Sequence, residues 1–364
     1  MARVLVAMSG GVDSSVAAFL LKKRGFDVIG ATMKLSPPCK TLPEDEKYVA
    51  CCSDGAIEQA KEIAQKIDIK HYVLNFRQVF KETVIDNFYK EYKRGRTPNP
   101  CVRCNKFIKF DALLKKARQL GADYICTGHY AKIQYNRVHK KFLLKRAKDK
   151  TKDQSYALYI LNRKNLRHIL FPLGGLTKQE VRKIAREAKF SNYARQESQE
   201  LCFVAQKDYR KFIAKFLKPK VGEIVDSKGN ILGKHKGIYF YTIGQRRGLG
   251  LSAARPYYVV AIDWRKNRIV VGFEEELYAR SLVADNLNFL SLSNLTKPLK
   301  AKAKIRYKHL SQEAAIYKID KDTVRVEFKK PQRAITPGQA VVFYQGEVVI
   351  GGGVIKRVED KKSD

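Results

Sequence analysis

A short glycine turn near the start of the chain has the residue types of an anion-binding site. It reads Ser9-Gly10-Gly11-Val12-Asp13-Ser14-Ser15. The apolar run at 4–8 predicts a buried strand before it, and the run at 16–21 predicts a helix that ends at Gly25. A strand, a turn and a helix N-terminus direct backbone N–H groups and the positive end of the helix dipole at one point. The glycines allow a phosphate to approach, and the serine hydroxyls add donors.

The turn lacks the Gly-Lys-Ser/Thr sequence of a Walker loop. It resembles instead the PP-loop of the ATP pyrophosphatase superfamily, whose members split ATP between the α and β phosphates. The resemblance implies an enzyme that consumes ATP, but it does not identify the product.

Two cysteines at CxxC spacing form a second candidate site. They are Cys101 and Cys104, within Gly95-Arg96-Thr97-Pro98-Asn99-Pro100-Cys101-Val102-Arg103-Cys104-Asn105-Lys106. The two prolines predict a stiff loop that is neither helix nor central strand. The flanking cations, Arg96, Arg103 and Lys106, favour the thiolate form. Such a pair suits a redox reaction, zinc binding or an iron–sulfur cluster, and the spacing alone leaves all three open.

The other cysteines give weaker signals. Cys202 lies in Glu197-Ser198-Gln199-Glu200-Leu201-Cys202-Phe203-Val204 and by itself is as well explained by a place in the core. We expect Cys39, Cys51, Cys52 and Cys126 to be reduced and for the most part buried or incidental, although a relay role for the adjacent pair Cys51 and Cys52 stays open.

The composition indicates a folded protein with a polyanionic partner. The chain has 364 residues, 45% of them hydrophobic, which is enough for two or three domains. Lys and Arg number 72 against 36 Asp and Glu, so the formal net charge is +36. The basic residues are spread along the chain, which favours broad basic surfaces over a tail. We therefore expect a nucleic-acid partner and binding that weakens with salt.

No run of about 18 apolar residues is present, and the first predicted strand begins close to Met1. We therefore expect a cytoplasmic protein with no membrane span and no signal peptide.

The elements that must position these residues alternate along the first part of the chain. Further strands are expected at 27–33, 71–76 and 124–127, and helices after Ser53 and over 110–120. This alternation predicts an α/β fold, a parallel sheet with helices on both faces. Ligands of such sheets bind beyond the C-terminal strand ends, where the glycine turn and Thr127-Gly128-His129 both fall.

The second half of the chain changes character. A hairpin is expected at 131–146, a capping box opens a helix at Thr177–Glu180, and a basic helix is expected at 207–217. Beyond Gly222, short alternating runs predict all-β modules, with the main boundary near 205–220 and a softer one near 275–285.

Taken together, the motifs resemble those of the tRNA-specific 2-thiouridylases, which replace O2 of the wobble uridine of tRNA with sulfur. The resemblance covers nearly the whole chain. It rests on the two segments quoted first and on Thr127-Gly128-His129-Tyr130, Lys152-Asp153-Gln154-Ser155-Tyr156, Cys202-Phe203, Thr242-Ile243-Gly244-Gln245-Arg246-Arg247-Gly248-Leu249-Gly250 and Thr336-Pro337-Gly338-Gln339. It implies a PP-loop catalytic domain at 1–208, a small, mainly β central domain at 209–280 and a C-terminal, tRNA-contacting β-barrel at 281–364.

The resemblance also implies roles for individual residues. It places ATP at Ala7, Met8, Ser9, Gly10, Gly11, Val12, Asp13, Ser14, Met33 and Gly128. It makes Cys104 the nucleophile and Cys202 the persulfide carrier. It places the target base at Asn99, Pro100 and Cys101, and further tRNA contacts at His129, Lys152, Asp153, Gln154, Arg306, Tyr307 and Gln339.

One residue departs from the family pattern. Better-known members carry an aspartate, proposed as a general acid/base, where this chain has Cys101. Two sulfur routes are therefore open. In the favoured one, a persulfide on Cys202 delivers sulfur and Cys104 closes a disulfide with Cys202. In the other, Cys101, Cys104 and Cys202 hold a [4Fe–4S] cluster whose open iron binds sulfide.

The implied reaction begins with ATP. The uridine O2 attacks the α phosphorus, pyrophosphate leaves, and sulfur then displaces AMP. The glycine turn and Asp13, with Mg²⁺, are expected to stabilise the pyrophosphate. The expected partners are the tRNAs for Glu, Gln and Lys and a sulfur donor, either a cysteine desulfurase or a relay protein. Two rival functions are another PP-loop enzyme, such as a tRNA-lysidine synthetase or an amidotransferase, and an RNA-binding protein without catalysis.

Overall fold

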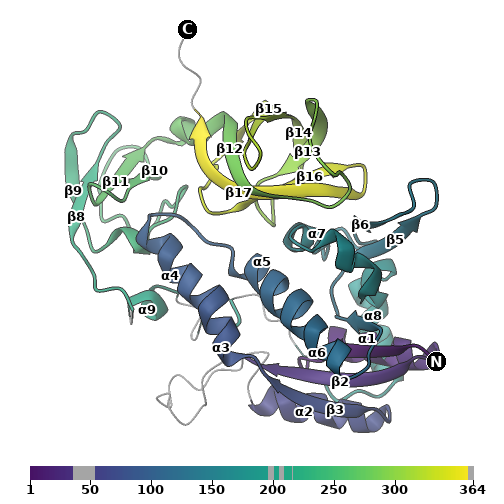
Figure 1. Cartoon of the computed structure of the whole chain (residues 1–364). Coiled ribbons are helices and arrows are strands. Elements are labelled where there is room, and N and C mark those ends of the chain that lie inside the picture. Colours follow the sequence, from purple (N-terminus) through teal and green to yellow (C-terminus); the bar gives the residue numbers. More distant parts are fainter. Residues whose placement is uncertain (36–53, 196–200, 205–208, 215, 360–364) are drawn as a thin grey trace. The chain divides into compact units, whose positions relative to one another are not determined.

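The computed structural model describes residues 1–35, 54–195, 201–204, 209–214 and 216–359 (Figure 1). The chain forms two compact units and passes between them more than once. The first unit contains Met1–Val84, Cys101–Asp208 and Glu347–Val349, and the second contains Ile85–Pro100, Tyr209–Gly346 and Ile350–Asp364. The three-part division expected from the sequence stays a prediction.

A five-stranded parallel sheet forms the centre of the first unit. Its strands are β1 (Arg3–Ala7), β2 (Asp27–Lys34), β3 (Lys70–Asn75), β4 (Tyr124–Cys126) and β7 (Ile169–Leu170), in the order β3-β2-β1-β4-β7. The order runs outward in both directions from β1 and β4, so the C-terminal ends of these two strands frame the switch point where ligands of parallel sheets bind. The expected α/β fold is confirmed.

Helices pack on both faces of this sheet. Val4 and Val6 of β1 share one core with α1 (Val12–Lys23), α2 (Asp54–Lys66) and α8 (Lys178–Glu187). Leu5 points to the other face and is fully buried, and α6 (Leu113–Gln119) contacts β4. The unit also contains α3 (Arg77–Phe80), α5 (Pro100–Cys104), α7 (Ser155–Leu158), the π-helix Asn105–Ala112, the 3₁₀ helices Arg163–His168 and Pro172–Gly175, and the predicted hairpin of β5 (Lys132–Asn136) and β6 (Lys141–Lys145).

The CxxC segment does not have the predicted conformation. We expected Pro98 and Pro100 to exclude a helix, but α5 begins at Pro100 and continues into the π-helix Asn105–Ala112. Proline fits the first position of a helix because the N–H of that position has no partner inside the helix. The second proline therefore starts the helix that carries both cysteines.

The second unit is mainly β (Figure 1). A four-stranded sheet has the order β10-β11-β8-β9, and six further strands close into a barrel because β12 pairs with both β15 and β17. The sheet consists of β8 (Gly222–Val225), β9 (Ile231–His235), β10 (Tyr258–Asp263) and β11 (Arg268–Gly272). The barrel consists of β12 (Tyr278–Phe289), β13 (Leu299–Lys304), β14 (Gln312–Lys318), β15 (Val324–Arg333), β16 (Ala340–Gln345) and β17 (Val348–Glu359).

The described residues of the second unit also form two helices and three short helical turns. The helix α4 (Asp86–Lys93) stacks Tyr92 on Tyr209 of α9 (Tyr209–Ala214), with ring centroids 5.6 Å apart. The turns are the π-helix Lys81–Ile85, which ends in this unit, and the 3₁₀ helices Ile238–Phe240 and Glu274–Leu277. No helix in the part of the chain that the structure describes is both long and apolar enough to cross a membrane.

Candidate nucleotide and thiol sites

The glycine turn follows β1 directly and leaves the start of α1 open. Gly10 has φ +70°, and a Cβ atom there would lie 2.5 Å from the Ala56 carbonyl oxygen, so a larger residue does not fit. Gly11 is the N-cap of α1, and no side chain caps the helix. The first backbone N–H groups of α1 therefore remain available to an anion.

The serines of the turn fix its shape. The Ser14 hydroxyl accepts from the Ser9 N–H at 3.1 Å and donates to the Gly11 carbonyl at 2.9 Å. The Ser15 hydroxyl donates to the same carbonyl at 3.1 Å. The two buried serines are thus bonded within the turn, so the backbone and Ser9 are its accessible donors.

Asn192 and Arg195 approach the turn from the segment after α8. Asn192 Nδ2 donates to the Gly10 carbonyl and to Ser15 Oγ, each at 3.0 Å. Arg195 Nη1 donates to the Gly10 carbonyl at 3.3 Å and to Gln59 Oε1 at 3.4 Å. These contacts hold the left-handed Gly10 in place. The sequence analysis missed them because nothing in their local pattern marks them.

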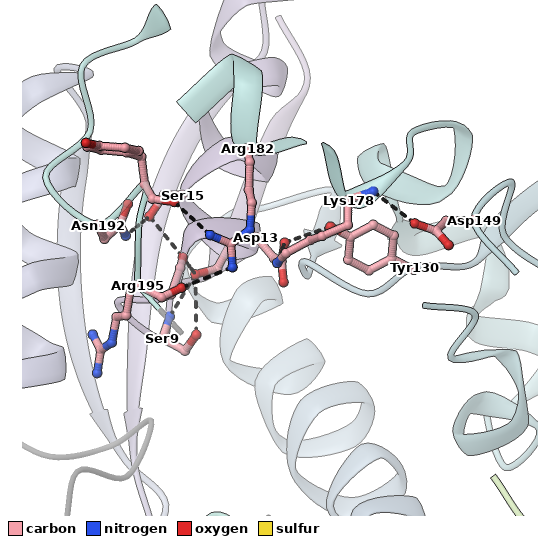
Figure 2. A network of polar contacts seen from close by, with 12 residues as sticks. Ser9, Asp13, Ser15, Tyr130, Asp149, Lys178, Arg182, Asn192 and Arg195 are labelled. Carbon is pink, nitrogen blue, oxygen red and sulfur yellow. Dashed lines mark hydrogen bonds and ion pairs between the residues drawn. The ribbon is translucent and has the colours of Figure 1, made fainter. Parts of the chain in front are cut away.

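Asp13 is held by two side chains from distant parts of the chain (Figure 2). Lys178 Nζ lies 2.7 Å from Asp13 Oδ1, and the Tyr130 hydroxyl donates to the same oxygen at 2.8 Å. The side chain of Lys178 is 10% exposed and that of Asp13 is 29% exposed. The pair is therefore an ion pair largely removed from water, where the attraction between opposite charges exceeds that of a surface pair.

The first turn of α8 positions Lys178. Thr177 Oγ1 accepts from the Glu180 N–H at 3.2 Å, and Glu180 Oε2 accepts from the Thr177 N–H, which confirms the predicted capping box. The Thr177 N–H and the Lys148 ammonium lower the pKa of Glu180 to about 2. The Lys178 N–H donates to Asp149 Oδ2 at 3.0 Å. Lys178, the first residue of this helix, is thereby fixed at its backbone.

The other residues assigned to ATP surround the turn. Ala7, Met8 and Val12 are buried, so only their backbone atoms are placed to meet a ligand. Met33 is half-buried at the end of β2, and a Cβ atom on Gly128 would lie 2.9 Å from the Asp13 carbonyl carbon and the Ser14 nitrogen. Gly128 thus packs directly against the turn.

Two of the residues assigned to tRNA are bonded within the first unit. Asp153 is 7% exposed and accepts from the Ala147 and Ser155 N–H groups and from the Ser155 hydroxyl. Gln154 Oε1 accepts from the Tyr130 N–H at 2.9 Å. Lys152 is half-buried. Gln154 therefore positions Tyr130, which in turn bonds Asp13.

His129 is also buried, at 8% exposure. Its Nδ1 lies 2.6 Å from Thr127 Oγ1 and its Nε2 lies 3.5 Å from Lys109 Nζ. Burial, with a further contribution from the Lys109 charge, holds the pKa of His129 well below its usual value. The imidazole is thus neutral at pH 7, and the Lys109 ammonium lies beside its Nε2 atom.

The two CxxC thiols differ in accessibility. Cys101 is exposed at the start of α5, whereas Cys104, one turn later, is 7% exposed. The π-helix Asn105–Ala112 begins at the next residue, and such wide turns occur often at functional sites. Cys104 and the half-buried Cys202 both carry reduced thiols in this structure.

The segments that carry Cys104 and Cys202 rest on the same short stretch of chain. Arg103 Nε donates to the Thr83 carbonyl at 2.6 Å. Phe203 packs edge-on against Phe80, with ring centroids 5.8 Å apart. Arg103, which precedes Cys104, and Phe203, which follows Cys202, therefore both contact the stretch 80–83 of the first unit.

The iron–sulfur cluster suggested for Cys101, Cys104 and Cys202 stays a prediction. Among the described residues, no three or more His, Cys, Asp or Glu side chains are placed to hold a metal ion. Cys39, Cys51 and Cys52, and residues 197–200 before Cys202, lie outside the described residues.

The remaining predicted residues belong to the second unit. Asn99 is half-buried and Pro100 buried. Arg306 Nη2 donates to the Ala334 carbonyl and, at 2.9 Å, to Thr336 Oγ1, while Tyr307 is 42% exposed. Gln339 Nε2 donates to the carbonyls of Thr97 and Pro98. Of these side chains, Tyr307 is the most open to a partner.

Three family models match successive parts of the chain. They are described as the tRNA methyl transferase HUP domain at residues 2–206, the tRNA methyl transferase PRC-barrel domain at 210–273 and the aminomethyltransferase beta-barrel domain at 279–355.

Curated relatives match over nearly the full length. The tRNA-specific 2-thiouridylase MnmA of Halothermothrix orenii is 53% identical over 98% of this chain and 99% of its own. The proteins of the same name from Acetivibrio thermocellus and Clostridioides difficile are 50% and 49% identical, over 97% and 98% of this chain and 99% and 98% of their own. These relatives, unlike the family models, are named for thiolation.

Proposed function

Because the chain belongs to the family of the tRNA-specific 2-thiouridylases, we propose that it exchanges O2 of the wobble uridine of tRNA for sulfur at the expense of ATP. It is a tRNA sulfurtransferase with a PP-loop domain. The observation that carries the proposal is that the uncapped start of α1 and the thiols of Cys104 and Cys202 belong to one compact unit.

The first step activates the base. The uridine O2 attacks the α phosphorus of ATP, the bond to the β phosphate breaks, and pyrophosphate leaves. The N–H groups at the start of α1 stabilise the developing charge, which is the main way in which enzymes favour such transfers.

The second step delivers sulfur. The terminal sulfur of a persulfide on Cys202 attacks C2, and AMP leaves with the former O2. The Cys104 thiolate attacks the Sγ atom of Cys202, the persulfide S–S bond breaks, and the sulfur stays on the base as the thiocarbonyl. The resulting Cys104–Cys202 disulfide is reduced by an external thiol, which supplies two electrons.

The turn fits a magnesium ion that arrives with ATP. Mg²⁺ in such sites takes one or two carboxylates together with substrate phosphates, and Asp13 supplies one carboxylate whose two described bonds both end on Oδ1. The ion would neutralise phosphate charge at Asp13.

The partners follow from the family. We propose the tRNAs for Glu, Gln and Lys as substrates, a cysteine desulfurase or a relay protein as sulfur donor, and the cytoplasm as location. The excess of 36 positive charges supports a polyanionic substrate.

The test is thiolation of an unmodified transcript with an anticodon uridine, with and without ATP, using anaerobically purified protein whose bound iron has been measured. We expect ATP-dependent 2-thiouridine and pyrophosphate in iron-free protein, and no thiolation by Cys104→Ser or Cys202→Ser.

Two results would contradict the proposal. Full activity in Cys104→Ser would indicate a different PP-loop reaction, and tRNA binding without pyrophosphate release would indicate a binding protein. Stoichiometric iron, lost together with activity in Cys101→Ala, would replace the persulfide route by the cluster held by Cys101, Cys104 and Cys202.

A further inference from the structure

Trp264 is the one tryptophan of the chain, and it is 48% exposed. It lies in the turn 264–267 between β10 and β11, two strands of the second unit. A single exposed apolar side chain is common on protein surfaces and by itself identifies no site. The residues around Trp264 supply the further evidence.

The turn that carries Trp264 is fixed by local hydrogen bonds. Asp263 Oδ1 accepts from the N–H groups of Arg265 and Lys266, each at 3.1 Å. The Arg265 guanidinium lies 5.6 Å from the centre of the Trp264 ring. A ring on a preformed turn can bind a flat partner with little loss of conformational entropy, and the arginine beside it favours a partner that carries negative charge.

A basic cavity adjoins the same turn. Its volume is about 590 Å³, and its lining includes Lys220, Glu223, Lys266 and Arg268. Arg268 Nη2 lies 2.7 Å from Glu223 Oε2, so these two charges compensate each other. The ammonium groups of Lys220 and Lys266 therefore give the cavity a net positive charge. An aromatic ring for a base and cations for the backbone phosphates are the two parts of a site for single-stranded nucleic acid.

The turn also lies close, along the chain, to the segment assigned to the target base. Gly95 has φ +64°, and a Cβ atom on it would lie 2.6 Å from Ile262 Cγ2 and 3.5 Å from Trp264 Cβ. The end of β10 thus packs directly against Gly95 within the second unit. Asn99 follows four residues later, and four residues span at most about 14 Å. An RNA strand that reaches Asn99 therefore passes near Trp264.

We infer that Trp264 stacks on an unpaired base of the tRNA anticodon loop, other than the wobble uridine, while Lys220 and Lys266 bind the phosphates beside that base. The inference rests on the proposed function, because it takes tRNA as the substrate. Bases of single-stranded loops are free to unstack from one another and to stack on an aromatic side chain.

This mode of binding suits an enzyme that acts on several tRNAs. Stacking is tolerant of sequence because every base has a flat face, and phosphate contacts carry no sequence information. The site would therefore hold an anticodon loop in place for thiolation without reading which amino acid the tRNA carries.

The experiment uses the fluorescence of Trp264 in the full-length protein, since no other tryptophan contributes. The probes are the anticodon stem-loop of an unmodified tRNA transcript and, as a control, a blunt duplex with the sequence of its stem. We expect the stem-loop to quench the emission and to protect the indole from acrylamide, and we expect the duplex to do neither. This measurement needs no variant, so it holds even if a substitution at 264 prevents folding.

Variants then separate stacking from charge. Trp264→Ala should bind the stem-loop about tenfold more weakly and raise the KM for tRNA to the same degree with kcat unchanged, whereas Trp264→Phe should stay within threefold of wild type. Lys266→Ala should reduce the slope of log K against log salt by about one, and Trp264→Ala should leave that slope unchanged. Tyr278→Ala is the matched control, because Tyr278 is equally exposed in the same unit. It should change neither quantity.

Three results would overturn the inference while thiolation persists. They are unchanged fluorescence on binding of the stem-loop, equal stem-loop affinity of Trp264→Ala and wild type, and quenching by a sulfur-donor protein in place of RNA. The last result would make the turn a protein-docking surface. Failure of the wild-type protein to bind or thiolate the intact transcript would count instead against the proposed function.

Discussion

The side-chain amide of Gln339, in the barrel, donates both of its described hydrogen bonds to the segment that precedes the CxxC cysteines. Its Nε2 lies 3.0 Å from the Thr97 carbonyl oxygen and 3.1 Å from that of Pro98, and the Thr97 N–H donates to Pro337 at 2.9 Å. The turn at 336–339 therefore holds the chain on both sides of Thr97. Gln339 was expected to contact tRNA, and its side-chain nitrogen is engaged inside the second unit.

We accordingly predict that Gln339→Ala lowers kcat about tenfold and leaves the Kd for tRNA within twofold. Loss of the two Gln339 side-chain hydrogen bonds would displace Asn99 and Pro100, which follow Thr97 and Pro98 directly. A small displacement near a reacting group lowers the reaction rate strongly. Single-turnover kinetics and filter binding measure the two quantities. A weaker Kd with unchanged kcat would instead support a direct contact between Gln339 and tRNA.

Substitutions of the neighbouring residues Arg306 and Tyr307 are predicted to have different effects, on stability at Arg306 and on tRNA binding at Tyr307. The exposed Tyr307 ring, with Lys304 Nζ 5.6 Å from its centroid, suits stacking on a base, whereas the Arg306 guanidinium is bonded to the barrel. Tyr307→Ala should weaken tRNA binding about tenfold, in line with loss of one stacked base, with unchanged thermal stability. Arg306→Ala should lower the melting temperature. The reverse pattern would mean that Arg306 is the main contact.

The capping box predicts a pH-dependent effect on stability. Hydrogen bonds keep the folded-state pKa of Glu180 at about 2, below its ordinary value of 4.5. The stabilisation is therefore complete above pH 4.5 and is lost as the pH falls towards 2. Glu180→Gln should be less stable than wild type at pH 7 and approach it in acid, as measured by chemical denaturation. Thr177→Ala should cost about 1 kcal/mol. A pH-independent difference between Glu180→Gln and wild type would contradict this view.

His129 predicts a second pH dependence of stability. Here the fold disfavours the charged form of the side chain, whereas at Glu180 it favours the charged form. The buried ring resists protonation, while the unfolded chain takes up a proton near pH 6.5. The free energy of unfolding should therefore fall as the pH drops below 6.5, by at most about 1.4 kcal/mol per pH unit from this group. His129→Phe, which keeps an aromatic ring between Phe110 and Phe171, should flatten the profile between pH 5 and 6.5. Replacement of the exposed His139 is the control and should not change it.

The sequence predicted the parts of the first unit that depend on local pattern. The strand–turn–helix around Gly10, the capping box at Thr177 and the helix ends at Gly25 and Gly121 are all present. The periodicity of apolar residues, helix caps and left-handed glycines each depend on a few neighbouring residues, so they can be recognised from a single sequence.

The contacts that complete the site could not be predicted in this way. Lys178 reaches Asp13 across 165 residues, and Gln339 reaches Thr97 across 242. In the sequence, Lys178 is one basic residue among 72 and the first residue of an ordinary helix. Only the packing of α8 against α1 in the folded unit brings it to the turn. The error at Pro100 arose because proline ends helices in their interior but is accepted at their start.

The helix α4 has a consequence for how the protein must be made. Phe88 and Tyr92 are nearly fully buried, and Tyr92 stacks on Tyr209 while Phe88 packs on Phe212. Both partners leave the ribosome long after α4 does, so the nascent chain exposes an aromatic helix while the parallel sheet is already able to form. A fragment that ends at residue 208 would keep these rings uncovered. Holding chaperones, rather than domain-by-domain folding, are therefore the expected requirement during synthesis.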